Sequence, residues 1–445
     1  MAVPSVLHFA MDILHWSLDI FPFSPSRDPW LLLMLDFADQ PYRWFPPRRN
    51  ALIAALVALF NRKVRLPRDK QVMAVRVEGD VALREKLQPG DRLLFMPNHS
   101  THADPETLLE SLRQAGFTTL TMAAYDVFLR NRFHAWLIQF SGGFSVDREG
   151  SDAKALKVAK ETLTRGKHGL TLFPEGNVYL QNDLVTPFHE GAAMIALRTA
   201  RELIEKKVRV LAVPMSMKYS HLTDARAAVT ARLHELAAAL QLKLAAEESP
   251  VELVRRVGMT ALHRNLKHRG IDSPQIDDLP ALIEAAAEKV LTRLEAKLGH
   301  KVAKDDTLIE RVRKARRTIH QVRLDPQRHA DHVAAVGWAD EAMLAFKIVS
   351  YNGRYFSEKP TLDRYAETIE KLEEDVTSTM PKPFGPREAI VRFNEPLDVT
   401  ARVAAFEEKA RAAVTELTRD AERAVQSGID AINEVNRLPG GVVRV

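Results

Sequence analysis

Strand-like apolar runs alternate with helical stretches between residues 72 and 219, and this alternation limits the folds that the chain can adopt. The segment Arg92 to Met96 is apolar on both faces, which is typical of a strand that is covered on both sides. The strand runs are 72–77, 92–96, 118–123, 143–146, 169–173 and 208–215, and the intervening helical stretches are 81–87, 104–111, 127–141, 152–165 and 191–206. This order predicts an α/β fold with a mostly parallel central sheet covered by helices.

Beyond residue 219 the strand pattern gives way to helices rich in Ala, Leu and charged residues. The region 222–380 reads as a series of helices, and examples are 223–242, 250–266, 279–298, 307–322 and 361–375. A strand run then returns at Ala389 to Phe393, before a last predicted helix from about 401 to 436. Because exposed loops tolerate long insertions, we interpret the block as a helical insertion into the α/β unit. The predicted domains are an N-terminal helical region at 1–71, an α/β domain at 72–220 plus 387–436, and an insertion at 221–386.

The composition indicates an ordinary globular protein. The chain has 445 residues, of which 46% are hydrophobic and 27% charged, so more than one domain is expected. There is no cysteine, which excludes disulfides, thiolate zinc sites and a cysteine nucleophile. The net charge is +5, but acidic and basic residues are mixed along the helices. This mixture argues against a continuous phosphate-tracking face, so we expect no nucleic-acid partner.

Positive charge is concentrated near the N-terminus. Eight basic residues lie between Arg43 and Lys70, opposed only by Asp69, and they bracket the apolar run Ala51 to Phe60. Ten apolar residues are too few to span a bilayer as a helix, which takes about 20, but they can lie among lipid headgroups. With the aromatic residues of the first forty positions and no signal-peptide pattern, this predicts peripheral or monotopic attachment to the cytoplasmic face of a membrane. The alternative is that these helices pack on the protein's own core.

The segment Pro97-Asn98-His99-Ser100-Thr101-His102-Ala103-Asp104 carries the sharpest chemical signal. It follows a buried strand and opens a helix, where open α/β sheets place their ligand sites. Asp104 can fix the tautomer of His99 and stabilise the imidazolium that forms when His99 takes a proton from a hydroxyl. Two other interpretations exist: Asp104 can serve only as a helix cap, and His102 can form a metal pair with His99, although the helical i, i+4 spacing is absent.

Further blocks follow the His99 segment in a specific order. They are Gly142-Gly143-Phe144-Ser145-Val146-Asp147-Arg148, Phe173-Pro174-Glu175-Gly176 and a strand that ends in Val213-Pro214. Together with His99-x4-Asp104, these blocks resemble the glycerolipid acyltransferase family, typified by bacterial lysophosphatidic acid (1-acylglycerol-3-phosphate) acyltransferases. Residues 187–192 and 395–397 are similar to further stretches of that family. The resemblance covers about 72–219 and 388–400.

The resemblance implies roles for particular residues. His99 would be the catalytic base, Asp104 would orient it, and Arg148 would contact a phosphate. The other residues that it places at the substrate are Gly143, Phe144, Glu175, Gly176 and Pro214. Glu175 would hold either an acceptor hydroxyl or the neighbouring loop. No metal site is expected.

The chain also departs from the family pattern. The family usually has Phe where Ser145 stands, and it often continues Glu-Gly-Thr-Arg, whereas this chain reads Glu175-Gly176-Asn177-Val178. Because that arginine helps to bind the acceptor phosphate in the family, the charge must come from elsewhere, such as Arg148 or Lys218, or the acceptor has no phosphate there.

The expected function is transfer of a fatty acyl group from acyl-CoA or acyl-carrier protein to a hydroxyl of a (lyso)glycerophospholipid-type acceptor, in phospholipid biosynthesis or remodelling. No cofactor is expected beyond the acyl thioester, which is a co-substrate. The expected partners are the lipid acceptor, the thioester donor and a membrane surface. The alternatives are a non-phosphate lipid acceptor, a hydrolase that uses the same histidine and water, and a non-catalytic lipid-binding scaffold built on the helical block.

Overall fold

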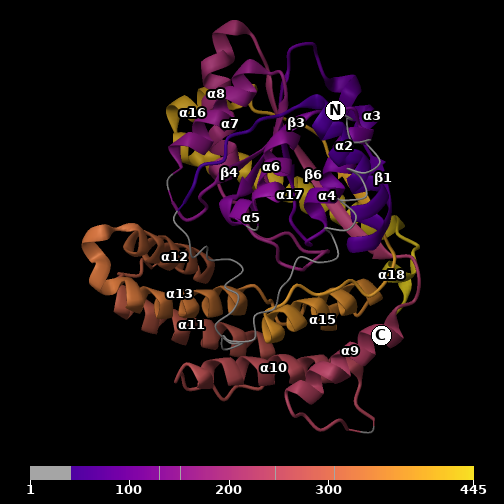
Figure 1. Cartoon of the computed structure of the whole chain (residues 1–445), viewed down its shortest axis with the longest axis vertical. Helices are drawn as coiled ribbons and strands as arrows, with labels where there is room; N and C mark the ends of the chain where they lie inside the picture. Colours follow the sequence, from indigo (N-terminus) through magenta and orange to yellow (C-terminus); the bar gives the residue numbers. More distant parts are fainter. Residues whose placement is uncertain (1–41, 130, 151, 246, 305) are drawn as a thin grey trace, which may run out of the picture.

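The computed structural model describes residues 42–445, apart from residues 130, 151, 246 and 305. The predicted features of the first forty residues therefore lie outside the described part of the chain. Figure 1 shows the described residues as an α/β part with a layer of helices beneath it. Among the described residues, no helix combines the length and the apolar character that crossing a bilayer requires.

Within the described part of the chain, the central sheet has eight strands. They are β1 (Val72–Glu78), β2 (Arg92–Pro97), β3 (Thr119–Ala124), β4 (Gly143–Val146), β5 (Gly169–Thr171), β6 (Val210–His221), β7 (Arg387–Phe393) and β8 (Leu397–Asp398). Their order is β1-β7-β6-β2-β5-β3-β4, with β8 beside β6. All pairs are parallel except those of β6 with β7 and β8. The predicted α/β class with a mostly parallel sheet is confirmed.

Strand β7 joins the sheet although the helical block separates it from the other strands in sequence. Val391 pairs with Val77 of β1, and Ile390 pairs with Lys218 of β6. Ala389, Ile390 and Val391 are all buried, as expected for a strand that is covered on both faces. The isolated strand run after the helical block is thus part of the central sheet.

Helices cover both faces of the sheet. They are α3 (Asp80–Lys86), α4 (Asp104–Gln114), α5 (Tyr125–Leu129), α6 (Arg132–Ser141), α7 (Ala153–Arg165), α8 (Gly191–Leu203), α16 (Val403–Glu408) and α17 (Ala410–Val435). In β2, Leu94 and Met96 pack into the core formed with α7, α8 and α17, whereas Phe95 packs into the core formed with α3 and α4. Successive side chains of a strand point to opposite faces, so the apolar run of β2 reflects burial on both sides.

The helical block forms cores of its own. Its helices are α9 (Arg226–Ala239), α10 (Pro250–His268), α11 (Leu279–Leu298), α12 (Leu308–Leu324), α13 (His332–Val349), α14 (Tyr355–Glu358) and α15 (Leu362–Thr377). Helix α12 begins with a capping box, in which the side chains of Thr307 and Glu310 each bond to the other residue's backbone N–H. Helix α13 packs on α11 and α12 and lies within the region 222–380 that the sequence predicts to be helical. In Figure 1, α12, α13 and α15 form the side of the layer nearest the sheet.

Two predicted helices are interrupted. The stretch 127–141 covers the end of α5 and all of α6, because Asn131 is extended and its side chain caps α6 by accepting from the His134 N–H. The predicted helix 401–436 breaks at Lys409, whose φ of −140° and ψ of 75° are not helical.

The remaining described elements are α2 (Ala51–Phe60), the π-helix η1 (Asn61–Asp69), the short 3₁₀-helices η2 (Ile204–Lys206), η3 (Pro326–Asp331) and η4 (Thr400–Arg402), and α18 (Pro439–Val442).

Candidate active site

His99 lies in the turn between β2 and α4. The side chain of Asn98 fixes this turn to the neighbouring strand β6. Its amide nitrogen donates to Met217 O at 3.0 Å, and its Oδ1 accepts from Met217 N at 2.7 Å. Backbone pairing between β2 and β6 ends at Pro97, and the two bonds of the Asn98 side chain continue the contact with β6. They hold His99 at the carboxyl edge of the sheet.

His99 and Asp104 form the pair that the sequence predicts. His99 Nδ1 lies 2.8 Å from Asp104 Oδ2, and Asp104 is fully buried. The carboxylate also accepts from the Thr101 N–H at 3.0 Å and from the Tyr219 hydroxyl at 2.8 Å. Since Nδ1 is engaged, the Nε2 atom is the ring nitrogen of His99 left for chemistry, and His99 lines the large cavity described below.

Glu175 holds the backbone around His99. Its Oε1 accepts from the His99 N–H at 2.6 Å, and its Oε2 accepts from the N–H and the hydroxyl of Thr186. Burial raises the pKa of Glu175 to about 7, because it disfavours the charged form more than these donors favour it. Of the two roles left open by the sequence, the structure shows that Glu175 holds the neighbouring loop. The ring of Phe173 stacks on the imidazole of His99 at a centroid distance of 4.2 Å.

Arg148 connects two of the sequence blocks. Its Nη1 donates to Gly176 O at 3.0 Å and to Asn177 Oδ1 at 2.7 Å, while its Nη2 lies 3.4 Å from Asp126 Oδ1. Gly176 has a φ of +76°, and a Cβ atom there would lie 2.9 Å from the ring of His189. Arg148 and Gly176 both line the cavity.

Three residues that the family resemblance places at the substrate are packed closely against other parts of the protein. Phe144 is fully buried in the core and packs its ring edge-to-face against Trp44, and Pro214 is buried in β6 opposite Met96. Neither residue lines the cavity, and both belong to the packed interior of the sheet. Gly143 does line it, but a Cβ atom there would lie 2.3 Å from Ile138 Cγ2, so this glycine mainly permits close packing of α6.

A cavity of about 930 Å³ opens beside His99. It falls within the range of about 300–1,000 Å³ that ligand pockets occupy. Val57 and Phe60 of α2, Leu137 and Ile138 of α6 and Phe346 of α13 contribute apolar walls. The cavity therefore lies between the α/β part and the helical layer and can hold a long apolar chain.

The predicted alternative source of positive charge, Lys218, is not at the cavity. Lys218 is buried, and its Nζ lies 2.5 Å from Asp183 Oδ1 and 3.7 Å from Asp363 Oδ2. This lysine is neutralised by its carboxylate neighbours. Arginines of α12 line the cavity instead, namely Arg313, Arg316 and Arg317. The basic sequence between residues 311 and 317 was the signal that could have pointed to them.

Helix α12 is also bonded to the loop that follows β4. His320 Nε2 lies 2.7 Å from Asp147 Oδ2, and Arg316 Nη2 lies 2.6 Å from Glu149 Oε1. All four side chains are mostly buried. The helical layer therefore positions the loop that carries Arg148.

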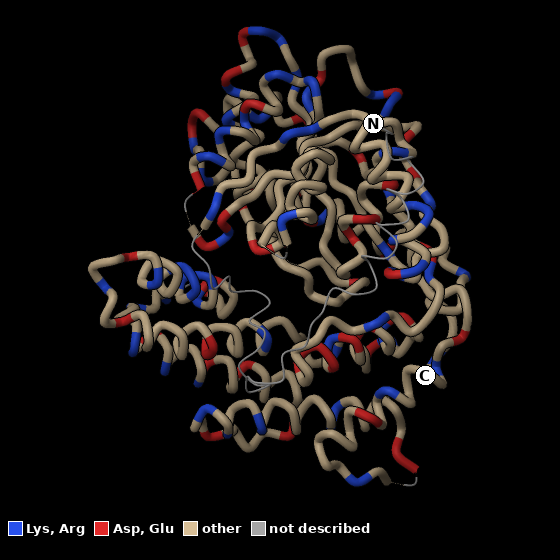
Figure 2. The backbone as a smooth tube through the Cα atoms, in the orientation of Figure 1, with Lys and Arg blue, Asp and Glu red and all other residues tan. Residues whose placement is uncertain are grey.

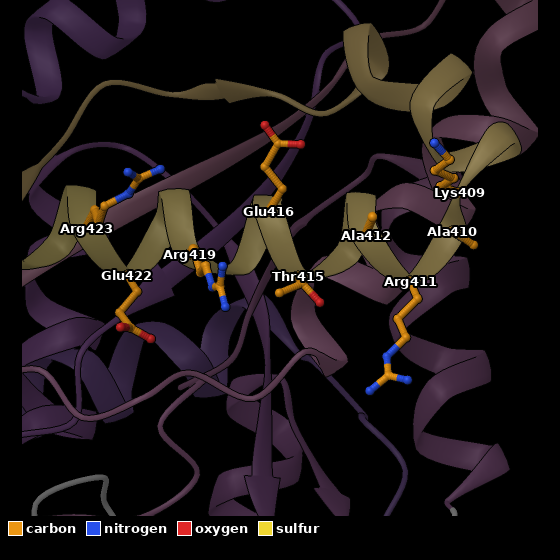
Figure 3. Close-up of a pocket in the computed structure, with 9 residues that line it drawn as sticks. All are labelled: Lys409, Ala410, Arg411, Ala412, Thr415, Glu416, Arg419, Glu422 and Arg423. Atoms are coloured by element: carbon orange, nitrogen blue, oxygen red, sulfur yellow. The ribbon is translucent and has the colours of Figure 1, made fainter. Parts of the chain in front are cut away.

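A second hollow, of about 1080 Å³, lies along the beginning of α17. Figure 3 shows Arg411, Thr415, Arg419 and Glu422 pointing to one side of the helix, with Glu416 on the other. None of the predicted site residues lines this hollow. Its lining mixes acidic and basic side chains, and the cavity beside His99 remains the candidate active site.

The fold and the contact between His99 and Asp104 define an α/β protein with a His–Asp pair at the carboxyl edge of its sheet, and comparisons with known proteins show what this part of the chain is similar to. Residues 75–218 match the acyltransferase family model. The 1-acyl-sn-glycerol-3-phosphate acyltransferase of Streptococcus pneumoniae (strain ATCC BAA-255 / R6) is 30% identical over 132 residues. The resemblance to the glycerolipid acyltransferases is confirmed. The aligned part covers 29% of this chain and 44% of that relative. No solved structure matches the chain.

Proposed function

We propose that this protein is an O-acyltransferase that transfers a fatty acyl group from acyl-CoA or acyl-carrier protein to a hydroxyl of a (lyso)glycerophospholipid-type acceptor. The observation that carries the proposal is the 2.8 Å contact between His99 Nδ1 and the buried Asp104, with the imidazole facing a cavity of about 930 Å³. The family match at 75–218 supports acyl transfer, and the similarity to an acyltransferase for a 1-acylglycerol phosphate supports a glycerolipid acceptor.

The proposed reaction uses His99 first as a base and then as an acid. Nε2 takes the proton of the acceptor hydroxyl while the hydroxyl oxygen attacks the thioester carbonyl carbon. The tetrahedral intermediate collapses, the C–S bond breaks, and the departing sulfur takes the proton from the imidazolium. Asp104 stabilises the imidazolium between these steps, and its Tyr219 and Thr101 donors hold the carboxylate in place.

We propose that the face made by α2 and α6 rests on the cytoplasmic leaflet of a membrane. Leu52 and Leu56 of α2 are 70% and 56% exposed, and Phe133 and Trp136 of α6 stack on each other at the surface. Helix α2 packs on α6, and its residues Val57 and Phe60 reach the cavity. An apolar face with basic residues around it suits an anionic lipid surface and would give lipid substrates a route to His99.

We propose that 72–220 and 387–436 act together as the catalytic domain and that 221–386 closes the cavity. The pairing of β7 with β1 and β6 supports the first part, and the α12 residues in the cavity wall support the second. The helical block then shapes the substrate site and is more than a surface appendage.

The test is an assay of labelled oleoyl-CoA with a panel of acceptors, comparing the wild type with His99→Ala. Acyl transfer to lysophospholipids that is lost in His99→Ala is the expected result. Release of free oleate in the absence of any acceptor would indicate a hydrolase instead. Lipid binding without turnover, unaffected by His99→Ala, would contradict the proposal and favour a binding scaffold.

A further inference from the structure

Helix α12 brings a cluster of positive charge to the cavity beside His99. The cluster consists of Arg313, Arg316 and Arg317, and we call it the α12 arginines. Figure 2 shows Lys and Arg positions gathered on this helix. Arg148 lines the same cavity from the loop after β4. Guanidinium groups from two parts of the chain thus meet at one site.

The carboxylates nearby neutralise only part of this charge. Arg316 is paired with Glu149, and Arg148 lies near Asp126. Arg313 donates to the Pro187 carbonyl at 3.3 Å, and no ion pair to a carboxylate is found for it among the described residues. Arg317 is exposed and has neither a hydrogen bond nor an ion pair within the described part of the chain. Within the described residues, Arg313 and Arg317 therefore have no ion pair to a carboxylate, although the charges of Glu310 and Glu149 act on Arg313.

The pKa values of residues beside the cluster reflect its positive charge and its burial. His189, which also lines the cavity, has a pKa lowered to about 3, first by burial and then by the charges of Arg313, Arg148 and the other α12 arginines. Burial also lowers the pKa of Arg313. A partly buried group of cations that lacks matching anions is stabilised by binding an anion.

The cluster lies near the segment in which this chain lacks the arginine that the family often has after Glu-Gly. Asn177 is in the segment where the family commonly carries an arginine, and its Oδ1 accepts from Arg148 Nη1 at 2.7 Å. Asn177, Arg148 and the α12 arginines line one cavity together with His99. We infer that Arg313 and Arg317, with Arg148, bind a phosphate group of the substrate and so determine its specificity. The inference rests on the proposed function.

The guanidinium groups of this site are suited to bind phosphate monoesters and diphosphates. A guanidinium forms two parallel N–H···O bonds to a phosphate, and several around one phosphate match its charge. Two sources have this chemistry: the phosphate of a lysophospholipid acceptor and the phosphates of the CoA donor. The acceptor source is favoured because the cluster faces the same cavity as His99, which must reach the acceptor hydroxyl.

The test compares Arg313→Gln/Arg317→Gln with the wild type. A matched control is Lys314→Gln, which removes a positive charge from the same helix at an exposed residue paired with Asp306, away from the cavity. KM is measured for 1-oleoylglycerol 3-phosphate, for monooleoylglycerol and for oleoyl-CoA. Loss of hydrogen bonds to a charged group should raise KM for the phosphate-bearing acceptor at least about ten-fold, with KM for monooleoylglycerol unchanged.

A binding measurement separates this inference from the proposed function. Calorimetric titration of 1-oleoylglycerol 3-phosphate, and separately of CoA, needs no turnover, so it gives an answer even if the protein transfers no acyl group. Weaker binding of the lysophospholipid in the double variant supports the inference, and weaker binding of CoA supports the phosphate site with the donor as its source. Equal binding of both ligands to variant and wild type would overturn it. If the double variant melts at a lower temperature, Arg317→Gln alone is used, because Arg317 is exposed.

Discussion

The hydroxyl of Tyr219 donates to Asp104 Oδ1 at 2.8 Å, while His99 contacts the other oxygen of the same carboxylate. Tyr219 belongs to β6, and Asp104 opens α4. The orientation of the proposed base therefore depends on a strand more than a hundred residues away, as well as on the local turn. Tyr219 was not among the predicted site residues.

We predict that His99→Ala lowers kcat by at least about 100-fold, because a positioned general base typically contributes about 10²–10⁴ in rate. The measurement is turnover of oleoyl-CoA with a lysophospholipid acceptor, with circular dichroism to verify folding. His168→Ala is the matched control, since His168 precedes β5 at the opposite edge of the sheet. A folded His99→Ala protein with normal turnover would refute the mechanism.

Tyr219→Phe should act through Asp104. The change removes one of three donors to a buried carboxylate, which should cost about 1–3 kcal/mol of stability. We expect kcat to fall while KM for both substrates stays unchanged, because Tyr219 touches the orienting residue and does not line the cavity. Denaturant titration and steady-state kinetics measure the two effects. A rise in KM with kcat intact would show that Tyr219 has another role.

Glu175→Gln should change how stability depends on pH. The pKa of Glu175 is about 7 in the folded protein against an ordinary 4.5, so the folded state holds a proton that the unfolded state releases between these values. The free energy of unfolding of the wild type should therefore fall, relative to that of the variant, as pH rises from about 4.5 to 7. The total is on the order of 3 kcal/mol. Urea titrations across this range test it, and parallel curves for the two proteins would contradict the raised pKa.

His320→Ala should loosen the loop that carries Arg148. The substitution leaves Asp147 Oδ2 buried without its partner at 2.7 Å, which should destabilise the protein by about 1–3 kcal/mol. Acyl transfer should also fall, because this loop positions Arg148 against Gly176 and Asn177. The exposed His329, on η3, gives the control variant His329→Ala. Equal urea midpoints for the two variants would contradict the role of the contact.

Leu52→Glu/Leu56→Glu should weaken attachment to lipid. These exposed leucines would place two carboxylates at an anionic membrane surface, so co-sedimentation with vesicles of phosphatidylglycerol and phosphatidylcholine should drop at least about ten-fold. Leu244→Glu, at an exposed leucine in the loop after α9, is the control. Turnover of a water-soluble short-chain acceptor should stay near the wild-type value. Unchanged sedimentation would rule out this face as the membrane contact.

The sequence determined the parts of the fold that depend on near neighbours. Short apolar runs and helical stretches located most of the strands and helices, because their patterns reflect local burial. His99 and Asp104 are separated by four residues across one turn, so their pairing followed from the local chain path. The helix breaks at Asn131 and Lys409 were missed, because single residues with non-helical backbone interrupt otherwise continuous helical patterns.

Only the tertiary structure decided which distant side chains meet. Phe144 and Pro214 lie in motif blocks, yet packing of the sheet buries both, and Lys218 is enclosed with Asp183 and Asp363. The α12 arginines come from a helix more than a hundred residues beyond the Phe173-Pro174-Glu175-Gly176 block and still share a cavity with His99. Local sequence fixes backbone conformation and the pairing of near neighbours, whereas contacts between distant segments depend on how whole layers pack, and no short stretch of sequence carries that information.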